Sequence, residues 1–494
     1  MFEAVELGQT LSKQDFKQQE TAFRTDLLML QRELQQANVA TLIIVSGVEG
    51  GGKGSVVDNL NKWFDSRGIA THAFWDETDE EKERPDYWRY WMRLPARGTT
   101  AIMFGGWYWD PIHAHTDKEL DDAALDEHAR RIKEFERMLH LDGLLIIKLW
   151  FHLSFDEHKI RLEERSQSPQ PDEHKSDKKE IQKRYQNFLL ASERVIRHTD
   201  IPEAPWHLIE ADDPYFRDAS VAKVLLRQIG QRLKDHRRGG DRRVRVDTPV
   251  VSLDEQPLTI LDKVDTDAAL DKDEYKKQLK LYQDKLTELT WQAYYNKHSA
   301  VIMFEGWDAS GKGGALRRVA NAIDARLYRG ISVAAPTDEE SAHHYLWRFW
   351  RQIPRAGYMT IYDRSWYGRV LVERVEGFAS TVEWTRSYQE INAFEEQLVN
   401  SGVVVIKFWL HITPEEQLRR FEERKTIPWK QHKLTEEDWR NRDKWDEYTQ
   451  VINEMVVRTS TSKAPWHIVP GNNKYYARID VLKHICERLE SALK

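Results

Sequence analysis

Apolar and polar residues follow one another along this chain at spacings that predict helices and strands in turn. Residues 12–38 and 272–298 place apolar side chains among polar ones at helical spacing, and each is followed by a short apolar run, a glycine-rich turn and another helical pattern. Residues 143–153 (GLLIIKLWFHL) and 402–412 (GVVVIKFWLHI) are apolar at successive positions, which is typical of strands buried on both faces of a parallel sheet. The pattern predicts an α/β fold with helices covering a parallel sheet.

The same pattern occurs twice at a nearly fixed offset. Residues 41–55 (TLIIVSGVEGGGKGS) correspond to residues 300–314 (AVIMFEGWDASGKGG), which places Lys53 on Lys312, 259 positions later. The offset also aligns WRYWMRLPARG with WRFWRQIPRAG, and it becomes 260 where APWHLI meets APWHIV. Solenoid repeats are only about 20 to 50 residues long, so this period indicates a duplicated domain.

The length of 494 residues allows two domains with a full core each. We predict an N-terminal domain over residues 1–233, a linker over 234–264 and a C-terminal domain over 265–494. The linker contains the charged stretch KDHRRGGDRRVRVDTPVVSLDEQP, which has a Gly-Gly pair, two prolines and no sustained apolar period. Its arginines offer contacts to a polyanion, and a solvated linker is the alternative.

The turn GWDASGKGG at residues 306–314 stands between a predicted strand and a predicted helix. With Lys312, this context indicates a phosphate-binding loop, because backbone N–H groups converge on phosphate oxygens and the helix N-terminus adds positive potential. The alternative is a tight turn that only needs small residues. Where such loops usually carry the hydroxyl that binds magnesium, this one has a glycine. The glycines of the loop are Gly306, Gly311, Gly313 and Gly314.

Two aspartates are candidates for the magnesium ligand that the loop lacks. Asp308 lies inside the loop, and Asp363 follows the apolar-leaning run YMTIY, which would place it at the carboxyl end of a strand. Ligands of open α/β sheets bind at that edge, and magnesium readily takes carboxylate and phosphate oxygens. We therefore predict that Asp308 and Asp363 hold Mg²⁺. Taken singly, Asp308 also suits a turn and Asp363 an ion pair with Arg364.

Three motifs in order, GWDASGKGG, LWRFWRQIPRAG and YDRSWYGRVLVERVEGF, resemble the polyphosphate kinase 2 family. The resemblance covers nearly the whole chain, twice. It implies two tandem P-loop kinase-like domains similar to thymidylate kinase, each a parallel β-sheet flanked by helices with a helical lid. It also implies Mg²⁺-dependent phosphoryl transfer from inorganic polyphosphate to AMP, giving ADP, as in two-domain members. The motif match assigns catalytic roles to Asp308, Lys312, Asp363, Arg364 and Arg369.

Two further sets of cations are candidates for binding. Arg348, in LWRFW, is a candidate for the phosphate of the acceptor nucleotide, because a guanidinium contacts two oxygens at once; a structural role beside its aromatic neighbours is the alternative. The polar stretch at 423–445 resembles a lid that closes over the donor and excludes water, with a solvated helical face as the alternative. Its assigned cations are Arg424, Lys425, Lys430 and Lys433.

The first copy keeps the loop lysine but not its partners. Under the 259-residue offset, Asp308, Asp363, Arg364 and Arg369 fall on Glu49, Phe104, Gly105 and Asp110. A phenylalanine cannot bind magnesium, and the cations of the second copy are missing. We therefore predict a degenerate, inactive N-terminal domain that either binds a phosphate chain or only supports assembly.

The composition of the chain limits its expected partners and its cellular compartment. The formal net charge of −7 argues against general nucleic-acid binding, and Cys486, as the only cysteine, excludes an internal disulfide and favours the cytoplasm. No stretch approaches the roughly 20 apolar residues that span a bilayer, so we expect no membrane partner. The expected partners are polyphosphate and AMP or ADP, and a homo-oligomer is conceivable.

Two other functions compete with the first. An ATP-dependent nucleoside monophosphate kinase of the thymidylate-kinase type would carry a similar loop, a similar DRSWYGR motif and a similar lid. A non-catalytic scaffold that binds polyphosphate would need the loop but not the carboxylates. The choice of phosphoryl donor separates the first two hypotheses, and turnover separates both from the third.

Overall fold

The structure is a computed structural model that describes residues 1–166, 178–238, 260–428 and 435–494. The chain divides into two compact units, each of which includes one short segment from the other repeat. Unit 1 comprises Met1–Glu77, Arg89–Val244 and Thr337–His344, and unit 2 comprises Thr78–Trp88, Arg245–Pro336 and Tyr345–Lys494.

The first repeat alternates strands and helices. Its strands are β1 (Thr41–Gly47), β2 (Ile69–Ala73), β3 (Thr100–Phe104), β4 (Leu145–His152) and β5 (Trp206–Glu210). Its α-helices are α1 (Lys13–Gln36), α2 (Lys53–Trp63), α3 (Asp79–Lys82), α4 (Trp88–Trp91), α5 (Trp109–Thr116), α6 (Asp122–Leu141), α7 (Phe155–Ser166), α8 (Lys178–Thr199) and α9 (Pro214–Arg237). Short 3₁₀ turns are η1 (Phe2–Val5), η2 (Ser66–Gly68) and η3 (Gly106–Tyr108).

The second repeat follows the same order. Its strands are β6 (Ser299–Gly306), β7 (Tyr328–Ser332), β8 (Met359–Asp363), β9 (Val403–His411) and β10 (Trp466–Pro470). Its α-helices are α10 (Lys272–Tyr295), α11 (Lys312–Ala320), α12 (Asp338–Ser341), α13 (Trp347–Trp350), α14 (Val372–Val375), α15 (Thr381–Asn400), α16 (Pro414–Thr426), α17 (Glu436–Asp443), α18 (Trp445–Thr459) and α19 (Lys474–Ala492). Its 3₁₀ turns are η4 (Leu261–Lys263) and η5 (Trp366–Val370).

Between the repeats, α9 continues to Arg237 and η4 begins at Leu261. Residues 239–259 of the predicted linker lie outside the described residues.

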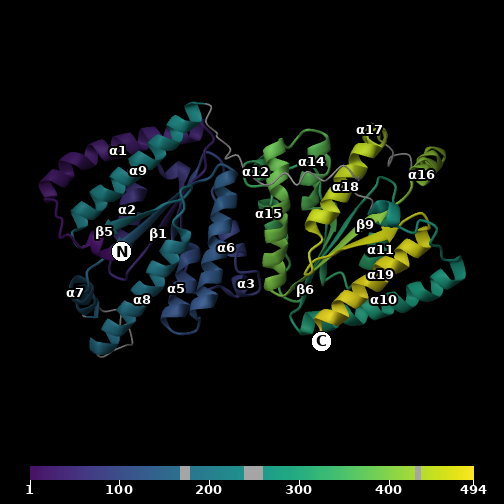
Figure 1. Cartoon of the computed structure of the whole chain (residues 1–494), viewed down its shortest axis with the longest axis horizontal. Helices are drawn as coiled ribbons and strands as arrows, with labels where there is room; N and C mark the ends of the chain where they lie inside the picture. Colours follow the sequence, from purple (N-terminus) through teal and green to yellow (C-terminus); the bar gives the residue numbers. More distant parts are fainter. Residues whose placement is uncertain (167–177, 239–259, 429–434) are drawn as a thin grey trace. The chain divides into compact units, whose positions relative to one another are not determined.

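Each unit is built on a five-stranded sheet whose neighbouring strands run parallel, with the strand orders β2-β3-β1-β4-β5 and β7-β8-β6-β9-β10 (Figure 1). The central strands β1, β4, β6 and β9 are buried along almost their whole length, as their continuous apolar runs predict. The predicted α/β fold is therefore confirmed in both repeats.

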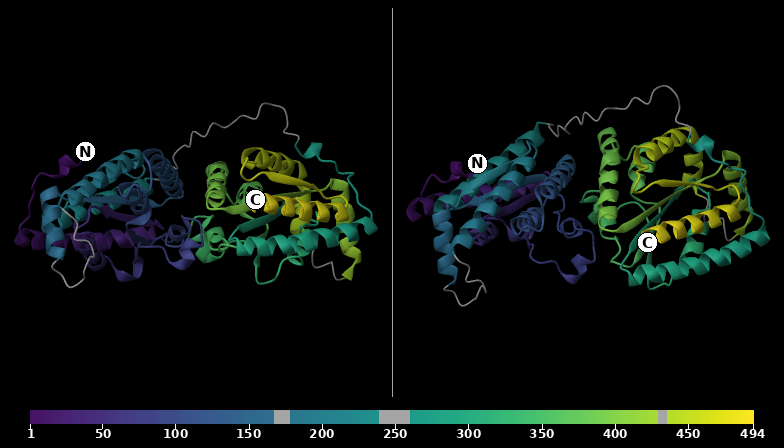
Figure 2. Two further views of the ribbon diagram at one scale, coloured as in Figure 1. Left: turned by 90° about the horizontal axis from the view of Figure 1, so that it is seen from below. Right: turned by 60° about the horizontal axis from the view of Figure 1, so that its bottom comes forward.

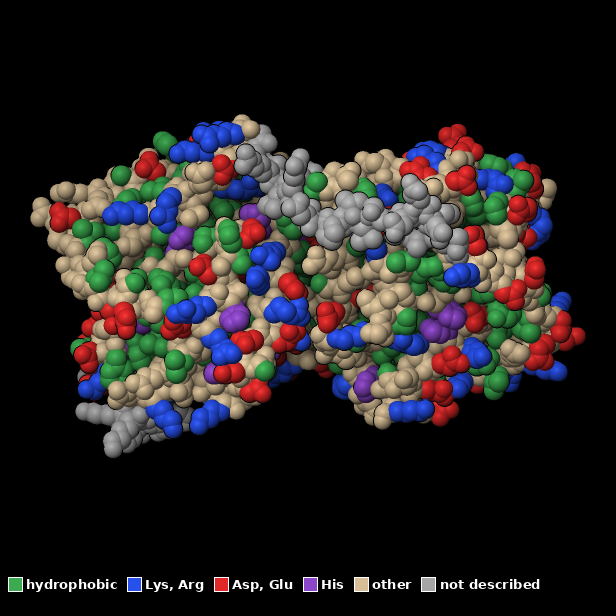
Figure 3. All heavy atoms as spheres, viewed as in Figure 1, with side chains coloured by type: hydrophobic (Ala, Val, Ile, Leu, Met, Phe, Trp, Pro, Cys, Tyr) green, Lys and Arg blue, Asp and Glu red, His purple; other side chains and the backbone are tan. Residues whose placement is uncertain are grey.

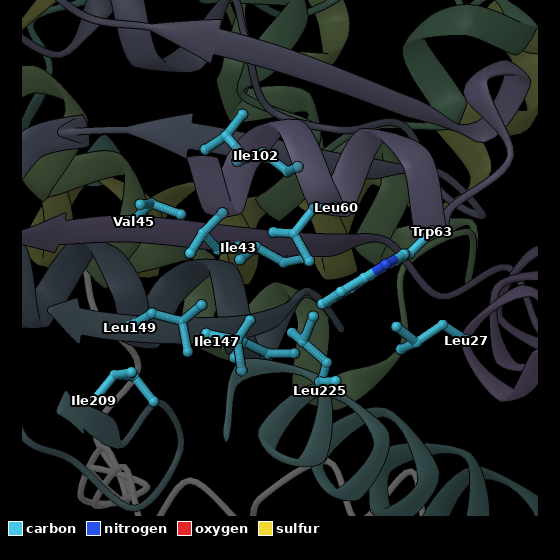
Figure 4. Close-up of a cluster of buried hydrophobic side chains, with 14 of the residues drawn as sticks. Leu27, Ile43, Val45, Leu60, Trp63, Ile102, Ile147, Leu149, Ile209 and Leu225 are labelled. Carbon is cyan, nitrogen blue, oxygen red and sulfur yellow. The ribbon is translucent and has the colours of Figure 1, made fainter. Parts of the chain in front are cut away.

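The core of each unit lies between the sheet and a layer of helices. In unit 1, side chains from β1, β3, β4 and β5 meet those of α1, α2 and α9, and Figure 4 shows Leu60 and Trp63 of α2 among the strand residues. Unit 2 repeats this arrangement with α10, α11 and α19, and α19 lies along α10 in Figure 2. Each fully buried side chain of the Leu or Ile type contributes about 1.5–3 kcal/mol to stability.

None of the helices among the described residues is both long and apolar enough to cross a bilayer. On the face drawn in Figure 3, basic and acidic side chains are interspersed over both units. We therefore expect any site for a polyanion to be a local cluster of cations at the carboxyl edge of a sheet.

Candidate active site

The glycine-rich loop of unit 2 joins β6 to α11 at the carboxyl edge of the sheet, as the sequence predicts. Gly306, the last residue of β6, has a φ of 149°, and a Cβ atom there would lie 2.5 Å from the carbonyl oxygen of Leu410 on β9. Only glycine allows the strand to turn so close to its neighbour. Gly311, at φ 110°, is the N-cap of α11, and Gly313 and Gly314 lie in the first turn. The loop therefore presents the N-terminus of α11 as an anion site.

The loop lysine is held by the loop itself. Lys312 Nζ donates to the carbonyl oxygens of Gly306 and Trp307, the latter at 3.2 Å. In unit 1, Lys53 Nζ makes the equivalent bonds to Gly47 and Val48, at 2.8 and 2.7 Å. The shared arrangement shows that both repeats place their lysine at the same point of the same loop.

Three of the predicted catalytic residues meet beside this loop. The strand register pairs Asp363 at the end of β8 with Phe304 of β6, and the Arg364 N–H donates to the Phe304 carbonyl at 3.1 Å. Arg364 Nη2 lies 3.9 Å from Asp308 Oδ1. Burial lowers the Arg364 pKa, but Asp308 and Glu305 outweigh this, and the net shift is upward; Glu437 and Asp363 act in the same direction. Asp308 thus lies beside the Arg364 guanidinium, and the Asp363 carboxylate contributes more weakly to the charge around it.

Arg364 adopts a strained backbone conformation. Its φ is 64°, in the left-handed region that non-glycine residues rarely occupy, and its counterpart in unit 1 is Gly105, at φ 84°. Backbone strain of this kind is common where a side chain must be aimed at a site. Here it carries the guanidinium to the edge where β6 and β8 end.

Glu305 is a member of the site that the sequence analysis missed. It lies next to the loop glycine at the end of β6, is only 6% exposed, and accepts a hydrogen bond from Ser365 Oγ at 2.8 Å. Burial raises the pKa of its carboxyl, while Ser365 and the charges of Lys312 and Arg364 pull the pKa down. Its counterpart in unit 1 is Ser46. The available signal was an acid at the end of an otherwise apolar strand, in VIMFEG.

The stretch predicted as a lid, residues 423–445, begins in the last turn of α16 and includes α17. Asn441 of α17 donates from Nδ2 to Asp308 Oδ2 at 2.9 Å, a contact that the sequence analysis also missed. Arg442 of α17 donates to the Pro414 carbonyl at 2.7 Å and so ties α17 to the start of α16. The lid helix therefore contacts the loop carboxylate directly.

The lid cations predicted from sequence are placed in part. Arg424 and Lys425 lie in the last turn of α16, where Lys425 pairs with Glu422 at 2.7 Å and lies over the Trp439 ring, 4.6 Å from its centroid. Lys430 and Lys433 lie outside the described residues.

Arg369 and Arg348 stand apart from the cluster around Arg364. Arg369, in η5, pairs with Glu373 at 2.9 Å and lies over the Tyr345 ring, 4.5 Å from its centroid. Arg348, in α13, donates to the Ala334 carbonyl just after β7 at 3.0 Å. The structure therefore places both arginines after strands β7 and β8, but contacts of Arg369 with the loop carboxylates do not occur among the described residues.

The chain matches a known protein family in both repeats. The model of the family described as polyphosphate kinase 2 matches residues 10–237 and 269–494. The chain belongs to the polyphosphate kinase 2 family. A relative from Pseudomonas aeruginosa named polyphosphate:AMP phosphotransferase is 45% identical over 497 residues, which are 100% of this chain and 99% of the relative. A relative of the same name from Pseudomonas syringae pv. tomato is 43% identical over 501 residues, with the same coverage.

A solved structure supports the fold at the same level. The crystal structure described as a putative polyphosphate kinase 2 from Pseudomonas aeruginosa has a TM-score of 0.89 and 43% identity, and the match covers 100% of this chain and 99% of that chain. The family resemblance read from the three motifs, and the tandem P-loop kinase-like fold that it implies, are confirmed.

The predicted magnesium ligands of unit 2 are two carboxylates, which is fewer than a metal site made of protein side chains alone needs. Among the described residues, no group of three or more His, Cys, Asp or Glu side chains could hold a metal ion. Magnesium is commonly bound by one or two carboxylates together with water and substrate phosphates. Asp308 in the loop and Asp363 at the end of β8 are the two carboxylates that the sequence analysis predicts for this role.

Unit 1 keeps the scaffold of the site but differs from unit 2 in the side chains placed on it. In both units a fully buried Lys–Glu ion pair at 2.7 Å holds the 3₁₀ turn that follows β3 or β8. In unit 2, Lys407 and Glu395 both hydrogen-bond the Tyr367 hydroxyl of η5. In unit 1, Lys148 and Glu136 both hydrogen-bond the Tyr108 hydroxyl of η3. The turns so anchored carry different residues. Where unit 2 has Asp363, Arg364 and Arg369, unit 1 has Phe104, Gly105 and Asp110.

Proposed function

We propose that this chain transfers a phosphoryl group from inorganic polyphosphate to AMP, giving ADP, and that unit 2 carries the reaction. The observation that supports it most is the cluster of Asp308, Asp363 and Arg364 beside the Lys312 loop, which has no counterpart in unit 1. Membership of the polyphosphate kinase 2 family and the names of the full-length relatives supply the donor and the acceptor.

The bond changes are simple. An oxygen of the AMP phosphate forms a bond to the terminal phosphorus of the chain, while the bond from that phosphorus to its bridging oxygen breaks. AMP leaves as ADP and the chain leaves shorter by one unit. The protein contributes position and positive charge, because phosphoryl transfer asks for little else.

The described residues suit these tasks. Lys312 turns from the loop carbonyls to the phosphate oxygens, and Arg364 stabilises charge that develops on the transferred group. Arg369 and Arg348 contact phosphate oxygens at the acceptor side, for which Arg369 gives up its pairing with Glu373. The lid helix α17 closes over Asp308 through Asn441 and excludes water.

Asp308 and Asp363 would hold Mg²⁺, which neutralises phosphate charge when bound. Asp363→Asn keeps the shape of the side chain and removes its charge. We expect the initial rate of ADP formation to fall by at least about 100-fold, with an unchanged thermal unfolding midpoint. Removal of magnesium by a chelator should stop the reaction of the unsubstituted protein, and re-addition should restore it. A fully active Asp363→Asn protein contradicts the assignment.

The donor assay decides among the competing functions. The protein is mixed with AMP and magnesium and with either polyphosphate or ATP, and ADP is measured. We expect ADP with polyphosphate. ADP that forms only with ATP would instead identify an ATP-dependent nucleoside monophosphate kinase, and binding of polyphosphate without ADP in either mixture would identify a scaffold.

The proposal involves no nucleic acid and no membrane lipid. We further propose a cytoplasmic setting, because Cys486 is buried and free and the chain needs no oxidising compartment. Assembly into a homo-oligomer stays a prediction that light scattering at assay concentration tests.

A further inference from the structure

A basic cavity of about 220 Å³ lies on the flank of the phosphate loop in unit 2. We call it the flank pocket. It lies between the loop and the start of α11, the helix α16 and the start of α19. Among the described residues that line it, one is an acid, Glu423, and five are cations: Arg317, Arg420, Arg424, Lys474 and Arg478.

The cations of the flank pocket reach the phosphate loop. Arg478 Nη2 would lie 3.4 Å from a Cβ atom on Gly314, in the first turn of α11. Arg420 is buried and donates to the carbonyls of Ala309 and Ser310 at 2.9 and 2.8 Å, so it fixes the shape of the loop. Arg317 donates to the Gly313 carbonyl at 3.3 Å. The pocket is therefore continuous with the glycines that bind phosphate.

One polar group in the pocket wall has no protein partner. Ser310 is only 2% exposed, and its Oγ accepts or donates no hydrogen bond within the described residues. A buried hydroxyl without a partner costs free energy unless a ligand or water satisfies it. Ser310 corresponds to Gly51 in unit 1, so this hydroxyl too belongs to unit 2 alone.

Unit 1 fills the same place with its own side chain. Ala477, which lines the flank pocket, corresponds to Arg217, and a Cβ atom on Gly52 would overlap the Arg217 guanidinium. Arg217 is 4% exposed and pairs with Asp218 at 2.8 Å. Asp218 corresponds to Arg478 and also accepts from Asn59 at 2.7 Å. An internal ion pair thus occupies the position that in unit 2 is open and cationic.

The lining also indicates the class of ligand. Besides its cations the pocket offers small and aliphatic groups such as Ala309, Ala315 and Leu410, and no aromatic ring occurs among the described residues that line it. Guanidinium groups bind phosphate oxygens with paired hydrogen bonds, whereas a nucleobase is usually held by stacking. The pocket therefore suits a chain of phosphates rather than a nucleoside.

We propose that the flank pocket binds phosphoryl groups of the donor chain beyond the one transferred, and so sets the preference of unit 2 for long donor chains. This inference rests on the proposed function, because it concerns the donor of that same reaction. Arg478 is the residue that determines the preference, since it links the pocket to Gly314 and becomes Asp218 in the repeat whose pocket is filled.

The test compares donors of different length. Arg478→Ala should raise the KM for long-chain polyphosphate about tenfold, because a hydrogen bond to a charged group is lost. The KM for tripolyphosphate and the KM for AMP should stay within about twofold. Ala477→Arg, which introduces the residue of unit 1, should have the same selective effect. Lys483→Ala removes a cation from the exposed surface of α19 and should change none of these values.

Each outcome bears on one hypothesis. A KM for long chains that is unchanged in Arg478→Ala, or a loss equal for all donors, overturns the pocket inference while the proposed function stands. If the unsubstituted protein forms no ADP from polyphosphate, the proposed function fails. Calorimetric titration with long-chain polyphosphate then still decides the inference: a Kd about tenfold higher in Arg478→Ala supports it, and an unchanged Kd refutes it.

Discussion

At the scale of single residues, unit 2 differs from unit 1 at a few positions of one sheet edge. Glu305, Asp308, Asp363 and Arg364 stand where unit 1 has Ser46, Glu49, Phe104 and Gly105. Arg364 and its counterpart Gly105 both have a positive φ, so this turn keeps the same kind of backbone conformation in both units. The two sites therefore differ chiefly in the side chains placed on corresponding elements.

Arg364 allows this separation of frame and chemistry to be tested. Arg364→Gly and Arg364→Ala both remove the guanidinium, so both should lower ADP formation by at least about 100-fold. At φ 64° a Cβ atom costs roughly 1–2 kcal/mol, so the glycine variant should be the more stable of the two by about 1 kcal/mol. Denaturant unfolding measures the difference. An alanine variant as stable as the glycine variant would show that the backbone there is unstrained.

Sequence reasoning found those residues of the site that carry a local signature. The glycines and Lys312 were recognised from their spacing, and Asp363 from the end of an apolar run. Glu305 and Asn441 were missed because a single acid in a strand, or an amide in a polar helix, shows its role only when the fold brings it to Asp308 or Arg364.

At the scale of elements, the turn after β8 is held in place by a buried ion pair beneath it. The buried pair of Lys407 and Glu395 bonds Tyr367 of η5, and Trp366 donates to the same carboxylate at 3.0 Å. Breaking a buried ion pair is costly because one charge is left without a partner. The strand that supplies Lys407 was predicted from its continuous apolar run, whereas α15 and its pairing with that strand were not, because the pairing depends on packing between distant parts of the chain.

The matching pair in unit 1 provides the control for this anchor. Glu395→Ala and Glu136→Ala should each destabilise their own unit by about 3–5 kcal/mol. Only Glu395→Ala should also lower the rate of ADP formation at temperatures below the unfolding transition of the variant, because η5 begins two residues after Arg364. Calorimetric unfolding and initial rates measure the two effects. An equal loss of activity in both variants would contradict a positioning role for this anchor in unit 2.

At the scale of the whole molecule, duplication has given one chain two copies of the same fold with unequal sites. Both copies keep the loop, its lysine and the buried anchor. Unit 2 has the carboxylates with Arg364 and the flank pocket, whereas among the described residues of unit 1 the side chains of Arg217 and Asp218 lie at the corresponding place. The offset in the sequence predicted this inequality at the sheet edge, but the filled pocket became visible only with the side chains in place.

The central claim is that phosphoryl transfer from polyphosphate to AMP takes place in unit 2 alone. The most direct test measures the initial rate of ADP formation, with polyphosphate, AMP and magnesium, for Lys312→Ala and Lys53→Ala. Both lysines begin a helix and bond their own loop in the same way, so the two substitutions are closely matched. The account predicts a loss of at least about 100-fold for Lys312→Ala and a change within about twofold for Lys53→Ala. Equal losses, or a larger loss for Lys53→Ala, would contradict it.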